Sequence, residues 1–213
     1  ALARSGLRDH LGGGFFRYAL DEAWRRPYFE KVALDQALHA DSFLLGHRLT
    51  GEARYAEIAR ETLDYTVREL GHPEGGFYTG EHGEGLSPTG APMEGAYYVW
   101  SETEVRSAAG EAADLLVDFF DIRGGGNVPP GSDALGTLGE ANLLAEVRSL
   151  SETAARLGLP LGPAQSALSR GRESLLAARH RRPRPALDRL IITHMNAALV
   201  SSLARAGVQL DAH

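Results

Sequence analysis

The strongest constraint on the fold is a repeat of apolar residues at helical spacing between Tyr28 and His47. Apolar or small side chains recur there at steps of three and four residues, which defines one face of an α-helix. The leucines at 34, 38 and 45 supply a second apolar face. A helix that is apolar on two sides packs between two layers, so we expect a layered helical protein with this helix buried inside it.

Further helices follow from the same spacing and from their start and stop signals. A helix over 52–70 joins the first through a short loop, so the two should form an antiparallel hairpin. Ser101 with Glu104 and Ser149 with Glu152 are capping boxes, which predict helices over 102–109 and 150–158. The remaining expected helices lie at 111–122, at 164–182, and from a cap at Asp188 to about residue 207.

Little β-structure is expected. Residues 75–79 and 95–100 combine aromatic and β-branched side chains between glycines, which predicts two short strands of a ribbon. The intervening residues 81–93 and the glycine- and proline-rich residues 123–139 should be loops. The fold class is therefore all-α: stacked helical hairpins with a short β-ribbon.

Composition excludes several classes of function. The chain has 213 residues, and 22 basic against 28 acidic residues give a net charge of −6, which disfavours nucleic acid and anionic membranes as partners. It has no cysteine and no apolar run long enough to span a bilayer, and we expect a cytoplasmic protein. The eight histidines are scattered without metal-ligand spacing, and the glycines do not form a phosphate loop, so we expect no metal and no cofactor.

A glycine triplet, Gly12-Gly13-Gly14, opens the first candidate site. Arg17, Tyr18, Asp21 and Trp24 follow it, and such side chains suit a sugar, because rings stack on C–H faces while charged groups bind hydroxyls. A purely structural turn is the alternative, because glycine also lets backbone segments approach closely.

Other charged residues form weaker candidates. Glu30, Lys31 and Asp35 lie in the first predicted helix, where Lys31 and Asp35 are four residues apart and should pair or line a cavity. Glu94 follows the acidic loop that contains Glu81 and Glu84, for which a solvated loop is the alternative. Asp188 lies before His194 and Asn196, and a solvated helix end is the alternative there.

Ordered blocks of this sequence resemble one known family. The most specific block runs from Asp9-His10-Leu11-Gly12-Gly13-Gly14-Phe15 through Arg17-Tyr18 to Glu30-Lys31 and Asp35-Gln36-Ala37. Gly75-Gly76-Phe77-Tyr78, Tyr98-Val99-Trp100, Asn142-Leu143-Leu144 and Arg182-Pro183 continue in the same order. The family is that of thioredoxin-domain-containing proteins, which includes the spermatogenesis-associated thioredoxin-like protein and many bacterial members.

The resemblance implies a fold and a site. Family members carry a thioredoxin-like domain followed by a six-hairpin helical toroid similar to that of N-acylglucosamine 2-epimerases and six-hairpin glycosidases. Residues 1–213 would be a single incomplete segment of this (α/α)6 toroid, without the thioredoxin-like domain. The catalytic candidates are Glu30, Asp35 and Asp188. The candidates for binding a carbohydrate substrate are Arg17, Tyr18, Asp21, Trp24, Lys31 and Glu94.

Departures from the family pattern leave the function open. The family usually has histidine where this chain has Phe16 and Tyr28, and phenylalanine cannot transfer a proton as imidazole does. One hypothesis is a sugar epimerase, isomerase or glycoside hydrolase. The alternative is a non-catalytic binding or scaffold module that needs a thioredoxin-like partner domain. A third is a remnant whose apolar ends meet a second copy of the chain.

Overall fold

The computed structural model describes residues 1–87, 89–134 and 136–210. The chain divides into two compact units, each built from three separate stretches. Unit 1 comprises Ala1–Leu11, Tyr18–Phe29 and Glu84–Arg184, and unit 2 comprises Gly12–Arg17, Glu30–Gly83 and Pro185–His213. Helix accounts for 49% and strand for 11%, so the prediction of a mainly helical protein is confirmed. Within the described ranges, no helix has the length and apolar character needed to cross a membrane.

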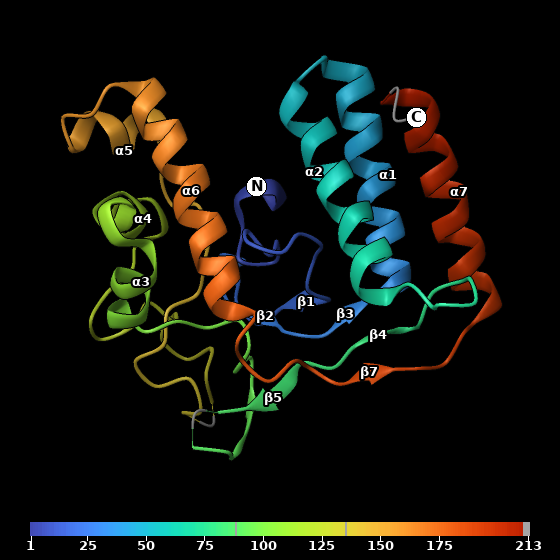
Figure 1. Cartoon of the computed structure of the whole chain (residues 1–213), viewed down its shortest axis with the longest axis horizontal. Coiled ribbons are helices and arrows are strands. Elements are labelled where there is room, and N and C mark those ends of the chain that lie inside the picture. The colour runs from blue at the N-terminus through green and yellow to red at the C-terminus, as the bar shows by residue number, and fades with distance from the viewer. Residues whose placement is uncertain (88, 135, 211–213) are drawn as a thin grey trace. The chain divides into compact units, whose positions relative to one another are not determined.

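Three helices form the body of unit 2 and lie side by side in Figure 1. They are α1 (Ala33–Thr50), α2 (Ala53–Tyr65), which continues as a π-helical turn over Thr66–Leu70, and α7 (Thr193–Gln209). The predicted hairpin of α1 and α2 is confirmed, because the two helices pack against each other. Ala37 of α1, Tyr65 of α2 and Leu199 of α7 meet in their shared core.

The start of the first helix was predicted too early. Lys31–Val32 is a strand, β3, which pairs antiparallel with β4 (Gly80–Glu81), and β4 pairs with β7 (Leu187–Asp188). Because the backbone of residues 31–32 bonds to a neighbouring strand, the helix can begin only at Ala33. The prediction that Lys31 and Asp35 share a helix face is therefore wrong.

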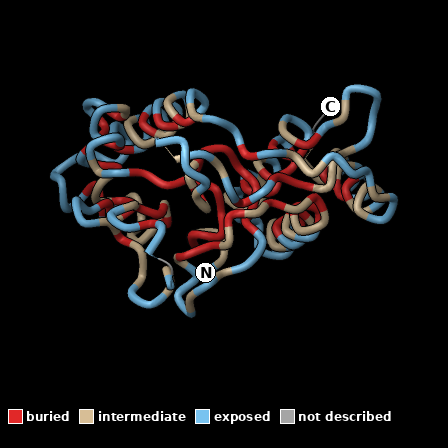
Figure 2. Tube along the Cα trace, turned by 90° about the horizontal axis from the view of Figure 1, so that it is seen from below, coloured by how far each residue is buried: buried red, intermediate tan, exposed pale blue. Residues whose placement is uncertain are grey.

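Two further expectations in unit 2 are wrong. Asp188 is a strand residue and does not cap the last helix, which begins at Thr193 after Ile192. The second apolar face of α1 is not buried, since Leu38 and Leu45 are 55% and 50% exposed. Figure 2 accordingly shows helices that carry both buried and exposed residues.

Unit 1 contains the other helices: α3 (Glu102–Ala109), α4 (Ala113–Phe120), α5 (Leu150–Arg156) and α6 (Leu161–Arg179), with short 3-10 turns at Leu2–Arg4 and Gly110–Ala112. The core between α3, α4 and α6 includes Val105, Leu116, Phe120 and Leu175. Both predicted capping boxes are present: the Glu104 amide donates to Ser101 Oγ at 3.2 Å, and the Glu152 amide donates to Ser149 Oγ at 3.2 Å.

Unit 1 contains two pairs of short strands, and the second pair lies in the segment around 81–93 that was predicted to be a loop. Tyr18–Ala19 (β1) pairs with Pro27–Tyr28 (β2), and Glu84–Leu86 (β5) pairs with Pro92–Glu94 (β6). Residues 95–98 form a turn, so the strand predicted over 95–100 is wrong, as is the one over 75–79. Tyr98 stacks on Phe29 at 5.7 Å between ring centroids, so its aromatic ring serves the core. The described part of 123–139 is irregular, as predicted.

Candidate functional site

The glycine triplet brings a loop close to the helices of unit 2. Gly13 and Gly14 have φ angles of 77° and 76°, in the left-handed region that favours glycine. A Cβ atom at Gly13 would lie 2.5 Å from the Glu61 carbonyl oxygen, so no larger residue fits. Buried Gln36 fixes the loop further, because its amide group accepts from Phe15 N and donates to Phe15 O, both at 2.7 Å. The triplet is therefore a structural element of this loop.

Lys31 is buried beneath that loop, with 1% of its surface exposed. Its ammonium group lies 4.2 Å from the ring centroid of Tyr65 and 5.1 Å from that of Phe16, and it donates to the Gly13 carbonyl at 2.9 Å. Across the strand pair lies Glu81, whose carboxylate accepts from the Tyr65 hydroxyl at 2.6 Å. Lys31 thus holds the loop onto the sheet in this structure.

Three of the predicted site residues come together at the start of α1. Arg17 Nη1 and Glu30 Oε2 form an ion pair at 2.6 Å, and the Arg17 amide donates to the Glu30 carbonyl at 2.9 Å. Asp35, in the first turn of α1, lies close enough to both residues for their charges to shift the pKa of its carboxyl group. Because side chains alternate along an extended strand, Glu30 points away from buried Lys31 and toward this partly exposed surface.

Burial favours the protonated form of the Asp35 carboxyl. Its Oδ2 atom is buried and has no hydrogen-bond partner among the described residues. This burial raises the pKa of the Asp35 carboxyl above its usual range, a shift that Arg17 opposes and Glu30 reinforces. A carboxyl group in this setting holds its proton more readily than an exposed one.

His39 joins this cluster, although it was not among the predicted site residues. It lies four residues after Asp35 on α1 and therefore on the same face of the helix. Its ring packs on Phe15 at 4.4 Å between centroids, and burial lowers the pKa of the imidazole. We call Arg17, Glu30, Asp35 and His39 the α1 cluster. The signal that could have identified His39 is its four-residue spacing from Asp35.

The other predicted residues lie elsewhere. Asp188, in β7 of unit 2, accepts a hydrogen bond from the Leu190 amide at 3.2 Å. In unit 1, Tyr18 stacks on Tyr28 at 5.0 Å, and Glu94 pairs with buried Arg26 at 2.9 Å. The Asp21 carboxylate accepts backbone N–H bonds from Ala23, Arg25 and Arg26, and so shapes the loop that carries Trp24.

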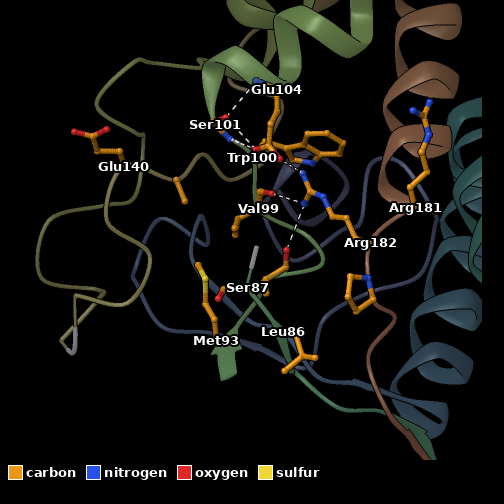
Figure 3. A pocket seen from close by; sticks show the side chains of 13 residues that line it. Leu86, Ser87, Met93, Val99, Trp100, Ser101, Glu104, Glu140, Arg181 and Arg182 are labelled. Carbon is orange, nitrogen blue, oxygen red and sulfur yellow. Dashed lines mark hydrogen bonds and ion pairs between the residues drawn. The ribbon is translucent and has the colours of Figure 1, made fainter. Parts of the chain in front are cut away.

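Unit 1 also contains a cavity of about 440 Å³, shown in Figure 3. Arg182 forms part of its wall: the guanidinium lies 4.0 Å from the ring centroid of Trp100, donates to the Val99 carbonyl at 2.6 Å and pairs with Glu104 at 3.0 Å. Most other lining side chains are apolar, among them Leu86 and Met93. None of the predicted site residues is among the described residues that line it.

A buried histidine makes the stability of unit 1 sensitive to pH. Burial is the main reason that the pKa of His10 lies below 6.5, although the Glu146 carboxylate, 3.4 Å from Nδ1, opposes the shift. Below about pH 6.5 the unfolded chain therefore binds this proton more readily than the folded protein does. The contribution of His10 to stability is intact above about pH 6.5 and is lost as the pH falls toward the pKa of the folded state.

We expect the free energy of unfolding of the wild-type chain to fall as the pH is lowered from about 7 to about 5. His10→Gln should flatten this dependence, which urea unfolding at several pH values will measure. His194→Gln, at an exposed position on α7, is the matched control. An equally steep pH dependence in His10→Gln and in the control would contradict the assignment.

Comparison with known proteins gives relatives over almost the whole chain. No protein-family model matches it. The chain is 37% identical over 220 residues to spermatogenesis-associated protein 20 of Homo sapiens and 35% identical to that of Mus musculus. An uncharacterized protein of Caenorhabditis elegans is 28% identical over 217 residues.

The human and mouse alignments cover 98% of this chain but only 28% of each relative, so the chain spans less than a third of their length. The name of the human and mouse relatives fits the resemblance seen in the sequence, and all the relatives named here are animal proteins.

Proposed function

We propose that the α1 cluster is an acid–base site that acts on a carbohydrate, in the manner of a sugar epimerase or isomerase. The supporting observation is the placement of Asp35 and His39 one helical turn apart, beside the Arg17–Glu30 ion pair. Burial shifts the pKa of Asp35 upward and that of His39 downward, and these directions favour the protonated carboxyl of a general acid and the neutral imidazole of a general base.

The roles follow from this chemistry. His39 takes the proton from the carbon next to the sugar carbonyl, and Asp35 gives a proton to the carbonyl oxygen or to the opposite face of the carbon. Arg17, half exposed and fixed by Glu30, binds a hydroxyl group or an anionic substituent of the sugar. No resident metal or cofactor is needed for this proton transfer.

The arrangement of the helices in unit 2 supports the toroid part of the proposal. The α1–α2 hairpin has a third helix, α7, packed along α1, as in a ring of helical hairpins. We infer that this chain is part of a six-hairpin toroid in a longer protein that also carries a thioredoxin-like domain. The similarity to much longer relatives agrees with this inference.

The test is exchange of substrate protons with solvent. The chain is incubated in deuterated water with a panel of aldoses, ketoses and N-acyl amino sugars, and deuterium at the carbon next to the carbonyl is measured by NMR. Asp35→Asn and His39→Gln should each slow the exchange about 100-fold or more, the usual contribution of a general acid or base. Asp41→Asn, which removes an α1 carboxylate that pairs with Arg205, is the control. Absence of exchange with every sugar, or equal rates in all three variants, would reject the proposal.

A non-catalytic carbohydrate-binding module is the second candidate. Phe16 and Tyr28 stand where the resemblance implies imidazoles, and both are engaged in packing: Phe16 over Lys31 and Tyr28 on Tyr18. A sugar that raises the melting temperature without any deuterium exchange would favour this candidate over the enzyme.

A further inference from the structure

The cavity of unit 1 drawn in Figure 3 has the features of a small-molecule site. Four segments that are distant in sequence line it: the β5–β6 hairpin, residues between 96 and 104, residues 140–141 and residues 181–183. Its volume of about 440 Å³ lies within the range of ligand sites in proteins, about 300–1,000 Å³. The α1 cluster belongs to unit 2, so a ligand of this cavity does not depend on the function proposed above.

The walls of the cavity are fixed by hydrogen bonds within unit 1. The Arg182 guanidinium donates to the Val99 carbonyl at 2.6 Å and pairs with Glu104 at 3.0 Å, which ties the segment after α6 to the segment before α3. The Trp100 amide donates to the Asn142 carbonyl at 3.1 Å, and the Asn142 amide donates to the Trp100 carbonyl at 2.6 Å. The cavity is therefore preorganised, and a ligand does not bear the entropic cost of ordering its walls.

Apolar side chains supply most of the surface of the cavity. Leu86 and Met93 come from the two strands of the hairpin, and Val99 and Trp100 come from the segment before α3. Leu86 is 50% exposed, so part of this apolar surface is uncovered. Water finds few hydrogen-bond partners against such a surface, whereas contact with apolar ligand atoms is favourable. The thioether chain of Met93 can adapt to the shape of a ligand.

The charged groups at the cavity give no net attraction for either sign of charge. Two carboxylates, Glu104 and Glu140, and two guanidinium groups, Arg181 and Arg182, are among the described residues that line it. Glu104 and Arg182 already neutralise each other, and exposed Glu140 and Arg181 add one charge of each sign. A charged ligand would lose hydration on entering the apolar space without gaining a buried counter-ion, so the site favours an uncharged molecule.

We propose that this cavity binds an uncharged, largely apolar small molecule. Met93 and Val99 contact the apolar body of the ligand. Arg182 keeps in place the wall that carries Val99, and its own charge is used within the fold.

The experiment compares three compounds that share one apolar ring and differ in charge: cyclohexanol, cyclohexylamine and cyclohexanecarboxylate. Binding is followed by isothermal calorimetry with the wild-type chain and by fluorescence with Trp24→Phe, which leaves Trp100 at the cavity as the single tryptophan. We expect cyclohexanol to bind and to change the fluorescence of Trp100. Both charged compounds should bind about tenfold more weakly or not at all, because they lose hydration without compensation.

Two variants of the cavity should weaken the binding of cyclohexanol about tenfold or more: Met93→Asp places a charge in the apolar wall, and Ala141→Leu fills part of the volume. The matched controls are Val200→Asp and Ala197→Leu, at exposed positions of α7 in unit 2, which should leave the affinity unchanged. If the melting temperature shows that Met93→Asp fails to fold, Ala141→Leu provides the test, because it introduces no charge.

The proposal is overturned if cyclohexanol does not bind at about 10 mM, a concentration that reveals even millimolar affinity. Charged compounds that bind as tightly as the alcohol would also contradict it, because the balance of charges would then have no effect. Equal affinities in the cavity variants and their controls, or binding that leaves Trp100 fluorescence unchanged, would place the compound outside this cavity.

Discussion

Replacing Asp9 by asparagine is expected to lower the free energy of unfolding of unit 1 by about 3–5 kcal/mol, because it leaves a buried arginine without its counter-ion. Arg179 and Asp9 are each 4% exposed and form an ion pair at 2.8 Å. Burial disfavours the charged guanidinium, but the charge of Asp9 and its hydrogen bond outweigh this effect and raise the pKa of Arg179. Arg179 therefore stays charged in the variant, and the cost of burying it is no longer compensated.

Urea unfolding of the variant and of two controls will test this expectation. Asp114→Asn breaks a pair of similar length, 2.7 Å to Arg106, in which the Asp114 side chain is 78% exposed, so it should cost less than about 1 kcal/mol. The double variant Asp9→Asn with Arg179→Met should recover part of the loss, since it removes both charges. If Asp9→Asn is as stable as Asp114→Asn, the buried pair does not have the importance assigned to it.

Replacing Lys31 by methionine is expected to lower the stability of unit 2 by about 3 kcal/mol. Methionine keeps much of the volume of the side chain but loses the ammonium group, its contacts with the Tyr65 and Phe16 rings and its hydrogen bond to Gly13. Tyr65, whose ring carries the ammonium contact, also donates its hydroxyl to buried Glu81, so the substitution disturbs the packing around that carboxylate as well.

The matched control for Lys31→Met is Arg60→Met, which removes an exposed cation from α2 of the same unit. It should change the free energy of unfolding by no more than about 0.5 kcal/mol. Adding Glu81→Gln to Lys31→Met should restore some stability, because it removes a buried negative charge from the strand pair that has lost its buried positive charge. Equal urea midpoints for Lys31→Met and Arg60→Met would show that the buried ammonium group contributes little.

The helices of this protein could be predicted because their signals are local. The capping boxes at Ser101 and Ser149 place two helix starts within one residue, and apolar spacing identifies the α1–α2 hairpin. The strands could not be found, because strands of two or three residues show no periodicity. Lys31 is a strand residue because of Glu81, fifty positions away, and Gly80 pairs with Asp188, more than a hundred positions away.

The difference between local signals and contacts between distant positions also explains what could be predicted of the candidate site. The charges of Glu30 and Asp35 stand out in an apolar segment, and together with Arg17 they do lie in one cluster. The sequence could not reveal that Lys31, next to Glu30, faces the interior, because that depends on where the helix begins.

The division of each unit among three stretches of chain has a consequence for how the protein can be cut and recombined. Neither unit corresponds to a continuous fragment, so expressing residues 84–184 alone would omit the segments that supply Asp9 and Phe29 to that unit. Contacts between sequence-distant segments also form slowly, because the intervening loops must close first. If the chain is cut in a segment that connects the two units, the resulting fragments must therefore reassociate before either unit can fold. Engineering of either unit should accordingly keep all of its stretches in one chain.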